Sequence, residues 1–437
     1  FWHFKRYQMP LIALFFPLAA WGIGWMLQRL QKSPVRLAIN AYLLLLIPIF
    51  SLALLAQFWS FHRSNVRYVY QQPYQMALWL RQNTPADAVI AVHDVGLMRY
   101  LGERTTLDMV GLTTPGAAAY WRNGPGSVAE FLIQRQPDYI ASYGYGHGYG
   151  LAYLADTSLY GEPLAVFTID DWQRWRNVAL AADTQGIYQP DWESIVPAHN
   201  AQQCSSDPAT VVWSLQVAEL ASEEAAHYQW DSHLDQGFVS EVRQVGEVVD
   251  GYRLINGEES FIPELGSDAA SSALILSTRV HAERAGVVTI YVDEQAIATR
   301  WIPAMPGEWF LLDTLIPANV VHQQMQVRIV PDVPNGYYMP ACHTLHFAEG
   351  EPSPEVDPLA VYQDGAFVLS DVERCTDCDE GSLVLDISFQ VVGIPSGDYR
   401  FFAHLYADEN QPPVAQWDGY FAGQPVGNWL PGNIRQE

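Results

Sequence analysis

Acidic residues are missing from the first fifth of this 437-residue chain. Residues 1–86 contain no aspartate or glutamate, but they hold eight of the 23 lysines and arginines. The rest of the chain therefore sets 48 acidic side chains against 15 basic ones. Nucleic-acid binding requires clustered lysine and arginine. We therefore expect no nucleic-acid partner.

Two long stretches, 7–28 and 37–62, carry no charge at all. Each is long enough to cross a hydrocarbon core of about 30 Å as a helix. Trp21, Trp25 and Trp59 lie toward their ends, as interfacial tryptophans do. No small-residue cleavage site follows the first stretch, which argues against a signal peptide. We predict a membrane domain at 1–62 with two transmembrane helices, at about 7–30 and 37–60, in contact with the lipid bilayer.

Cysteine is scarce, and four thiols fit either redox compartment. Cys375 and Cys378 form "CTDC", which has the spacing of half a zinc site. A complete set of ligands would need Cys204, Cys342 or His343 nearby, and a local disulfide is the alternative that we favour. We predict no metal ligands and no cofactor, and leave the need for a divalent metal open.

Strand and helix patterns alternate after the apolar region. The sequence predicts a helix over 66–83, a helix before Pro137 and a short helix at "DWQRW" capped by Asp170. Strands are expected at 88–93, near 105–110, at "DYIAS" and at "PLAVFTI". This alternation predicts a small α/β domain at 63–203.

Two groups in this domain are candidates for ligand contact. His93 and Asp94 end a strand, where sites of α/β domains often lie, although a polar pair that caps the next turn is the alternative. The segment "SYGYGHGYGLAY" at 142–153 places Tyr145, His147 and Tyr149 where they are able to contact a glycan. Its alternative is a surface loop whose glycines permit positive φ.

Short strands dominate the remainder. A β-sandwich is predicted at 204–350, with a hairpin turning at Asp293–Glu294, and a second, apparently truncated β-sandwich at 355–437. The fold class is thus a membrane helical hairpin, an extracytoplasmic α/β domain and one or two β-sandwich modules. Aromatic residues of the β-modules either fill a core or form a carbohydrate platform: Trp301, Trp309, Tyr337, Tyr338, Trp417 and Tyr420.

Several stretches resemble one enzyme family. "HFKRYQMPLIALFFPLAAWGIGWML" resembles a late transmembrane segment of bacterial polyprenyl-phosphate-sugar-dependent glycosyltransferases of the GT-C class, which includes protein O-mannosyltransferases. "ALWLRQNTPADAVIAVHDVGLMRYLGERTTLDMVGL" is similar to the segment that follows their last membrane helix. "VAELASEEAAHYQW" and "LINGEESF" are similar to a β-rich appendage, and "YRFFAHLYADENQPPVAQWDGYFAGQPVGNWLPG" to a cell-surface β-sandwich module.

The resemblance implies a multi-pass protein of the cell membrane, with residues 63–437 outside the cytoplasm. The charges alone leave this orientation nearly balanced, because cations lie on both sides of the helices. The enzymes have many more membrane helices and an early catalytic acid, whereas no acid precedes Asp87 here. We therefore expect the C-terminal portion of a glycosyltransferase, without catalytic residues and inactive by itself.

The same resemblance suggests a donor site. Lys5 and Arg6 would lie at the outer leaflet, where a polyprenyl-phosphate sugar presents its phosphate. Guanidinium binds phosphate with two parallel hydrogen bonds, and His3 and Tyr7 are nearby candidates. The alternative is a pair of cations that merely flank a membrane helix.

Two functions follow for the whole chain. In the first, this is part of a transferase that moves a sugar from a polyprenyl-phosphate donor to a glycan or protein acceptor outside the cytoplasm. In the alternative, it is a membrane-anchored, non-catalytic surface protein with glycan- or protein-binding β-sandwich modules.

Overall fold

The structure is a computed structural model. It describes residues 9–29, 34–144, 152–155, 157–193, 196–197, 204–232, 240–245, 248–348, 357–374, 385–393, 395–397, 399–408, 411–432 and 434–436. The chain forms two compact units. Unit 1 comprises Phe1–Asp108, Pro137–Ala152 and Glu162–Pro190, and unit 2 comprises Met109–Gln136, Tyr153–Gly161 and Asp191–Glu437. Residues 109–136 and 153–161, which lie inside the expected α/β domain, thus belong to unit 2.

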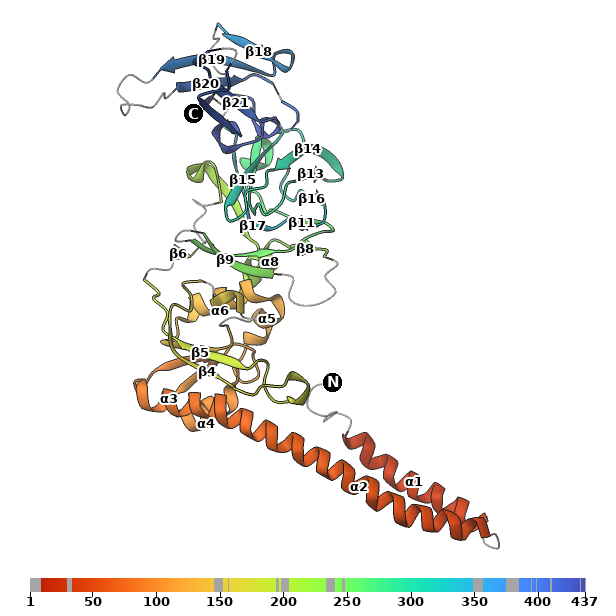
Figure 1. The fold of residues 1–437 in the computed structure, drawn as a ribbon. Helices are drawn as coiled ribbons and strands as arrows, with labels where there is room; N and C mark the ends of the chain where they lie inside the picture. Colours follow the sequence, from red (N-terminus) through yellow and green to blue (C-terminus); the bar gives the residue numbers. More distant parts are fainter. Residues whose placement is uncertain are drawn as a thin grey trace. The chain divides into compact units, whose positions relative to one another are not determined.

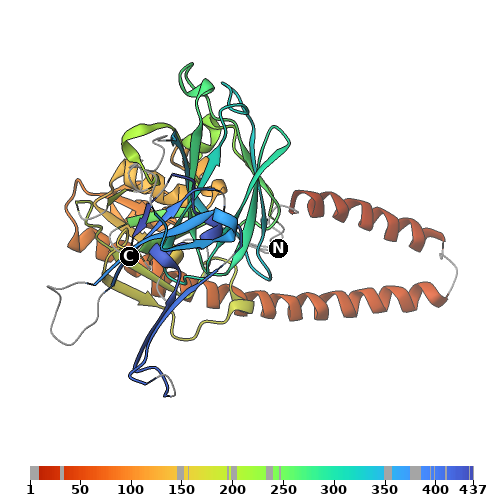
Figure 2. The same ribbon diagram turned by 90° about the horizontal axis from the view of Figure 1, so that it is seen from above.

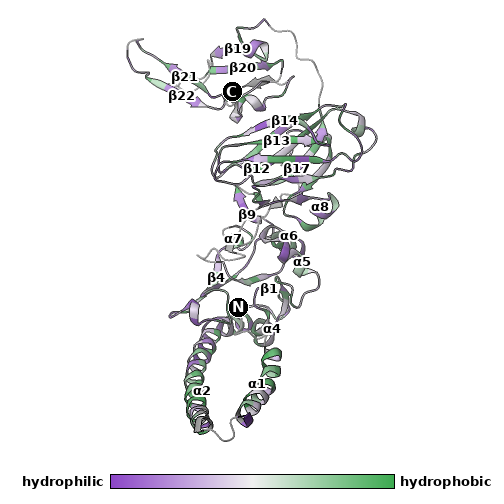
Figure 3. Ribbon diagram, turned by 90° about the vertical axis from the view of Figure 1, so that its right-hand side faces the viewer, coloured by the Kyte–Doolittle hydropathy of each residue, from purple (hydrophilic) through white to green (hydrophobic). Residues whose placement is uncertain are grey.

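Two apolar helices open unit 1. Helix α1 (Met9–Arg29) and helix α2 (Pro34–Val69) run in opposite directions (Figures 1, 2 and 3). Large apolar side chains are exposed along both helices. By length and composition, one described helix, within Asn40–Asn83, is able to cross a membrane, and Pro10–Met26 is a shorter apolar helix. The predicted second span stays a prediction.

A five-stranded sheet forms the centre of unit 1, in the order β2-β1-β3-β5-β4. Strands β1 (Val89–Val92), β2 (Thr105–Asp108) and β3 (Tyr139–Ser142) are parallel. Strand β5 (Thr184–Tyr188) runs antiparallel to β3 and to β4 (Pro163–Thr168). Helices α3 (Gln75–Asn83) and α4 (Val95–Gly102) supply core residues such as Met76 and Met98. The four strands predicted for this sheet are confirmed.

A π-helical turn, η2 (Tyr70–Tyr74), joins α2 to α3. It contains Pro73, which has no backbone N–H to donate to the preceding turn, so the helix widens locally. This widening places the buried Gln72 next to the sheet, where Gln185 Nε2 donates to Gln72 Oε1 at 2.9 Å. The predicted helix at "DWQRW" is wrong: a 3₁₀ turn, η3 (Arg174–Arg176), forms there, and Asp170 does not cap it. The hydroxyl of Tyr68 donates to Asp171 O and accepts from Gln173 N, both at 3.3 Å.

Unit 2 contains a β-sandwich. One sheet has the order β14-β13-β16-β11-β8, and the other has the order β15-β12-β17-β7. Their inner faces share a core that includes Leu276, Val288, Leu312 and Ile329. The predicted hairpin is present, because Asp293 and Glu294 both adopt positive φ between β13 and β14. The strands are β7 (Val211–Gln216), β8 (Gln229–Trp230), β11 (Glu259–Phe261), β12 (Leu274–His281), β13 (Gly286–Val292), β14 (Gln295–Ile302), β15 (Trp309–Ile316), β16 (Val327–Asp332) and β17 (Pro340–Phe347).

Further elements of unit 2 pack on one another around a buried ion pair. The guanidinium of Arg253 donates from Nε and Nη2 to both oxygens of Glu223 at 2.6 Å and to Asn123 Oδ1 at 2.9 Å. It also lies 4.5 Å from the ring of Trp230. The elements joined here are α5 (Ala117–Asn123), α8 (Leu220–Ala225), β8 and β10 (Val248–Arg253); α6 (Pro125–Arg135) and β9 (Ser240–Val245) pack beside them, and β6 (Val196–Pro197) pairs with β10.

A disulfide closes the sandwich from outside its core. Cys204 bonds Cys342 of β17, at a sequence separation of 138 and a Cα–Cα distance of 6.0 Å. This pairing rules out Cys204 and Cys342 as thiolate ligands that complete a zinc site. His343 is also engaged, because its Nδ1 lies 2.9 Å from Thr278 Oγ1. Cys375 and Cys378 lie outside the described residues.

A C-terminal β module completes unit 2. Its sheet has the order β18-β19-β20-β23, formed by Ala360–Tyr362, Phe367–Arg374, Leu385–Val391 and Ile434–Gln436. A separate hairpin pairs β21 (Phe401–Leu405) with β22 (Ala415–Gly419). Asn428 joins this module to strand β14, since its side chain accepts from Trp301 N at 2.8 Å and donates to Trp301 O at 2.6 Å. Short helices are α7 (Ala152–Ala155), η5 (Pro208–Thr210), η6 (Ala269–Ser271), η7 (Gln363–Gly365), η8 (Phe421–Gly423) and η9 (Val426–Asn428).

We predict that Cys204→Ser, Cys342→Ser and the double variant lose the same amount of stability. Each breaks the same loop of 138 residues, so the free energy of unfolding should fall by about 2–5 kcal/mol in all three. Urea unfolding of the full chain in detergent measures this. A double variant as stable as the parent chain, or one that loses twice as much as each single variant, would contradict the pairing.

Candidate functional site

The residues predicted to bind donor or glycan lie outside the described part of the chain. This applies to His3, Lys5, Arg6 and Tyr7 at the first apolar stretch, and to Tyr145, His147 and Tyr149 in the Gly/Tyr-rich loop. Their roles stay predictions. The candidate site described here is therefore built from other residues.

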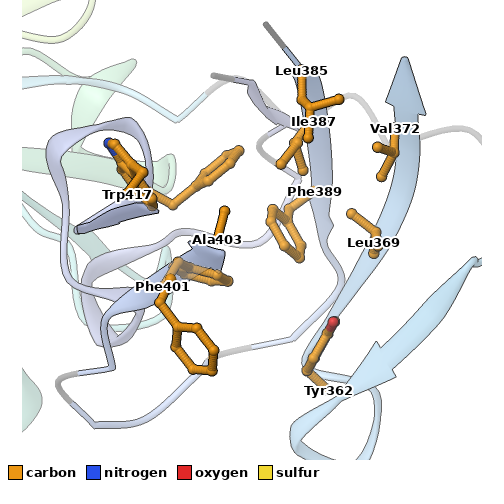
Figure 4. A pocket seen from close by; sticks show the side chains of 11 residues that line it. Tyr362, Leu369, Val372, Leu385, Ile387, Phe389, Phe401, Ala403 and Trp417 are labelled. Carbon is orange, nitrogen blue, oxygen red and sulfur yellow. The ribbon is translucent and has the colours of Figure 1, made fainter. Parts of the chain in front are cut away.

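An apolar pocket opens in the C-terminal β module between the sheet and the β21–β22 hairpin (Figure 4). Its volume is about 450 Å³. Strands β19 and β20 supply one wall and the hairpin supplies the other, and the side chains point toward one another across the gap. The lining residues are Tyr362, Leu369, Val372, Leu385, Ile387, Phe389, Phe401, Phe402, Ala403, Trp417 and Phe421.

The floor of this pocket is an aromatic cluster. Phe389 lies 4.9 Å from Phe421 and 5.1 Å from Phe401, measured between ring centroids. Trp429 is fully buried and stacks on Phe401 at 5.8 Å. Tightly packed rings have few alternative rotamers, so the floor is rigid before any ligand arrives.

The rim of the pocket is exposed. Trp417 is 41% exposed and Phe402 is 71% exposed, although both are large apolar side chains. The polar groups of the lining are the hydroxyl of Tyr362 and the indole N–H of Trp417. Beside them in the hairpin, His404 Nε2 lies 3.7 Å from Asp418 Oδ1. A mostly apolar pocket with a few polar groups at its edge is typical of ligand sites.

The other predicted aromatic residues have structural roles. Tyr338 is buried in the sandwich core, and Trp301 is held against the C-terminal module by Asn428. Trp309 packs on Tyr252 and on His281, with ring centroids 6.1 Å and 5.6 Å apart. Of this set, Trp417 lines the pocket. The sequence identified Trp417 as one of several candidate aromatic residues. The alternation of residues along β22 does not show that this strand faces an open pocket.

Metal chemistry has no support among the residues that the structure describes. They contain no group of three or more histidine, cysteine, aspartate or glutamate side chains arranged to hold a metal ion. We therefore assign no metal ligand.

Comparison with known families gives one match. A family model described as a domain of unknown function, DUF8728, matches residues 64–205, which include the sheet of unit 1. No curated protein sequence matches this chain.

Several solved structures are similar to part of the chain. The carbohydrate-binding module CBM6cm-2 of Cellvibrio mixtus lichenase 5A has 13% identity and a TM-score of 0.22, over 32% of this chain and 99% of that module. The CBM36-1 domain of a xylanase from the hindgut metagenome of Trinervitermes trinervoides has 13% identity and a TM-score of 0.19, over 32% and 97%. The glucuronidase BtGH115A has 7% identity and a TM-score of 0.18, and the match spans only 14% of its length. The site is therefore assigned from the geometry of this chain.

We predict that His281 makes unit 2 sensitive to acid. Burial, with a smaller effect from Arg243, lowers the pKa of His281 from 6.5 to about 4 in the folded protein, against the opposing charge of Glu283. Between these two values only the unfolded state binds the proton, so stability falls as the pH falls, by about 3 kcal/mol in total.

The free energy of unfolding, measured by urea titration at pH 7 and at pH 4, tests this prediction in the parent chain and in His281→Gln. The variant should lose less stability on acidification than the parent. An identical loss in both proteins would show that His281 is not the responsible group.

Proposed function

We propose that this protein is a membrane-anchored binding protein that works outside the cytoplasm and holds its ligand in the pocket of the C-terminal β module. The observation that carries the proposal is the exposure of Trp417 and Phe402 beside a preformed pocket of about 450 Å³. Exposed apolar patches of this kind usually mark interaction sites.

The location is supported by two features. Disulfides such as Cys204–Cys342 persist in oxidising compartments, which lie outside the cytoplasm. The apolar helix within Asn40–Asn83 has the length and composition of a membrane anchor.

A neutral glycan is the ligand that we favour. The indole face of Trp417 and the ring of Phe402 offer flat apolar surfaces against which the C–H face of a sugar ring is able to stack. The hydroxyl of Tyr362 and the indole N–H of Trp417, both in the pocket lining, are able to bond sugar hydroxyls. The excess of acidic residues beyond residue 86 disfavours anionic polymers.

A polypeptide strand is a second candidate. In the described residues β21 and β22 pair only with each other, so each offers an unpaired edge to which a strand is able to add. Its apolar side chains would enter the same pocket.

The glycosyltransferase interpretation also stays a proposal. It rests on the sequence resemblance and on Lys5 and Arg6, which lie outside the described residues. Residues 63–437 would then serve the enzyme as its acceptor-binding part.

We predict that Trp417→Ala weakens glycan binding about tenfold or more, because the variant removes the aromatic face on which the sugar ring stacks. Full-length protein in nanodiscs is mixed with insoluble mannan, xylan, cellulose and peptidoglycan, and the sedimented fraction is measured. Trp175→Ala is the matched control, since Trp175 is an exposed tryptophan of unit 1.

Unchanged sedimentation of Trp417→Ala with a polysaccharide that binds the parent chain would reject the pocket as the glycan site. Strand addition would be favoured if the parent chain bound an apolar peptide and no polysaccharide, and if Trp417→Ala no longer bound that peptide.

A further inference from the structure

A polar cluster lies at the point where the sheet of unit 1 changes direction. From β1 the chain passes through α4 to β2 on one side of β1, and it later returns to β3 on the other side. The carboxyl ends of β1 and β3 therefore diverge at this place. In open α/β sheets such switch points are where ligands bind.

Four segments bring polar side chains to this point. Asp94 follows β1 and Tyr143 follows β3, while Gln185 comes from β5 and Gln72 from the π-helical turn. Tyr143 donates its hydroxyl proton to Asp94 Oδ2 at 2.5 Å, and Gln185 Nε2 donates to the same oxygen at 2.9 Å. His93 Nδ1 lies 3.2 Å from Asp94 Oδ1.

The carboxylate of Asp94 does not serve its own helix. Asp94 occupies the position before α4, but its side chain makes no capping hydrogen bond there. The alternative expected from the sequence, a polar pair that caps the next turn, is therefore not what this carboxylate does. Its oxygens are turned toward the switch point instead.

Hydrogen bonds within the cluster favour the ionised form of Asp94, without an ion pair to lysine or arginine among the described residues. Burial by itself raises the pKa of Asp94, but His93, Tyr143 and Gln185 outweigh it, and the pKa lies below the ordinary value. Burial and the charge of Asp94 raise the pKa of Tyr143, so that this hydroxyl stays protonated as a donor. Within the described residues no lysine or arginine forms an ion pair with Asp94.

Acceptor capacity remains at the site. Among the described residues, two donors meet Asp94 Oδ2 and the ring of His93 lies beside Oδ1, and the Asp94 side chain is 31% exposed. Gln185 Oε1 is buried and accepts no hydrogen bond from the described residues. A partly exposed carboxylate beside an imidazole suits the hydroxyls of a sugar, which are able to donate to Asp94 Oδ1.

We propose that His93 and Asp94, positioned by Tyr143 and Gln185, form a binding site for the neighbouring hydroxyls of a sugar in unit 1. Tyr143 and Gln185 are positioning residues, because both of them bond the oxygen that faces away from the ligand. This site is separate from the pocket of the C-terminal module and does not depend on the function proposed for that pocket.

Saturation-transfer NMR on the full chain in nanodiscs tests the site. The probes are the methyl glycosides of mannose, glucose and galactose, with ethanolamine as a cationic probe. At least one glycoside should bind the parent chain, and Asp94→Asn should weaken it about tenfold, because a hydrogen bond to a charged acceptor becomes one to a neutral amide. Asp171→Asn, an exposed carboxylate that pairs with Arg67, is the matched control and should bind like the parent.

Two further variants keep the test decisive. His93→Gln leaves the bonds of Asp94 with Tyr143 and Gln185 in place and should still weaken the glycoside, even where Asp94→Asn fails to fold. Trp417→Ala should leave this signal unchanged, which separates the site from the C-terminal pocket. Unchanged binding by folded Asp94→Asn or His93→Gln, binding of ethanolamine alone, or no glycoside signal in the parent chain would each overturn the proposal.

Discussion

The arrangement of unit 2 depends on the buried pair of Arg253 and Glu223. Burial of a guanidinium is costly unless partners replace its water, and here a carboxylate and an amide oxygen accept from Nε and Nη2 and an indole face covers the group, while Nη1 meets no hydrogen-bond partner among the described residues. These partners come from α5 and from the α8–β8 segment, with Asn123 and Glu223 100 residues apart in sequence, so the pair fixes how these segments meet. The sheet that carries β10 in turn covers the polar outer face of the sandwich, where Asp250 pairs with Arg279.

Much of the secondary structure was predictable from local patterns. The buried run at 89–92, the hairpin at Asp293–Glu294 and the strands of the β-modules appear where periodicity and turn residues indicate them. The helix predicted at "DWQRW", with Asp170 as its cap, does not form; instead the hydroxyl of Tyr68, more than a hundred residues earlier in the chain, donates to Asp171 O and accepts from Gln173 N. Local capping preference was outweighed by a tertiary contact, which no window of sequence contains.

The candidate sites were also predictable only in part from the sequence. His93 and Asp94 stand out in the sequence because they end a strand, but Gln72 and Gln185 carry no signal of their own; only the π-turn and the sheet order bring them together. The pocket of the C-terminal module is a property of the gap between β20 and a hairpin, so its lining reads in the sequence as ordinary core. Conversely, the pairing of Cys204 with Cys342 follows from β17 lying beside the entering chain, which spacing alone does not reveal.

The pairing of β7 with β17 sets an order of events during synthesis. The ribosome makes β7 first, yet its hydrogen-bonding partner is the last strand of the sandwich. Until residues 340–347 have emerged, β7 lacks the strand with which it pairs in this sheet, and Cys204 lacks the thiol of Cys342. Unit 1 does not wait in this way, because its three parallel strands lie within residues 89–142. The sheet of unit 1 is therefore able to fold while the sandwich still lacks β17 and exposes unpaired, aggregation-prone strand edges. A chaperone matters most to the protein between the synthesis of β7 and that of β17.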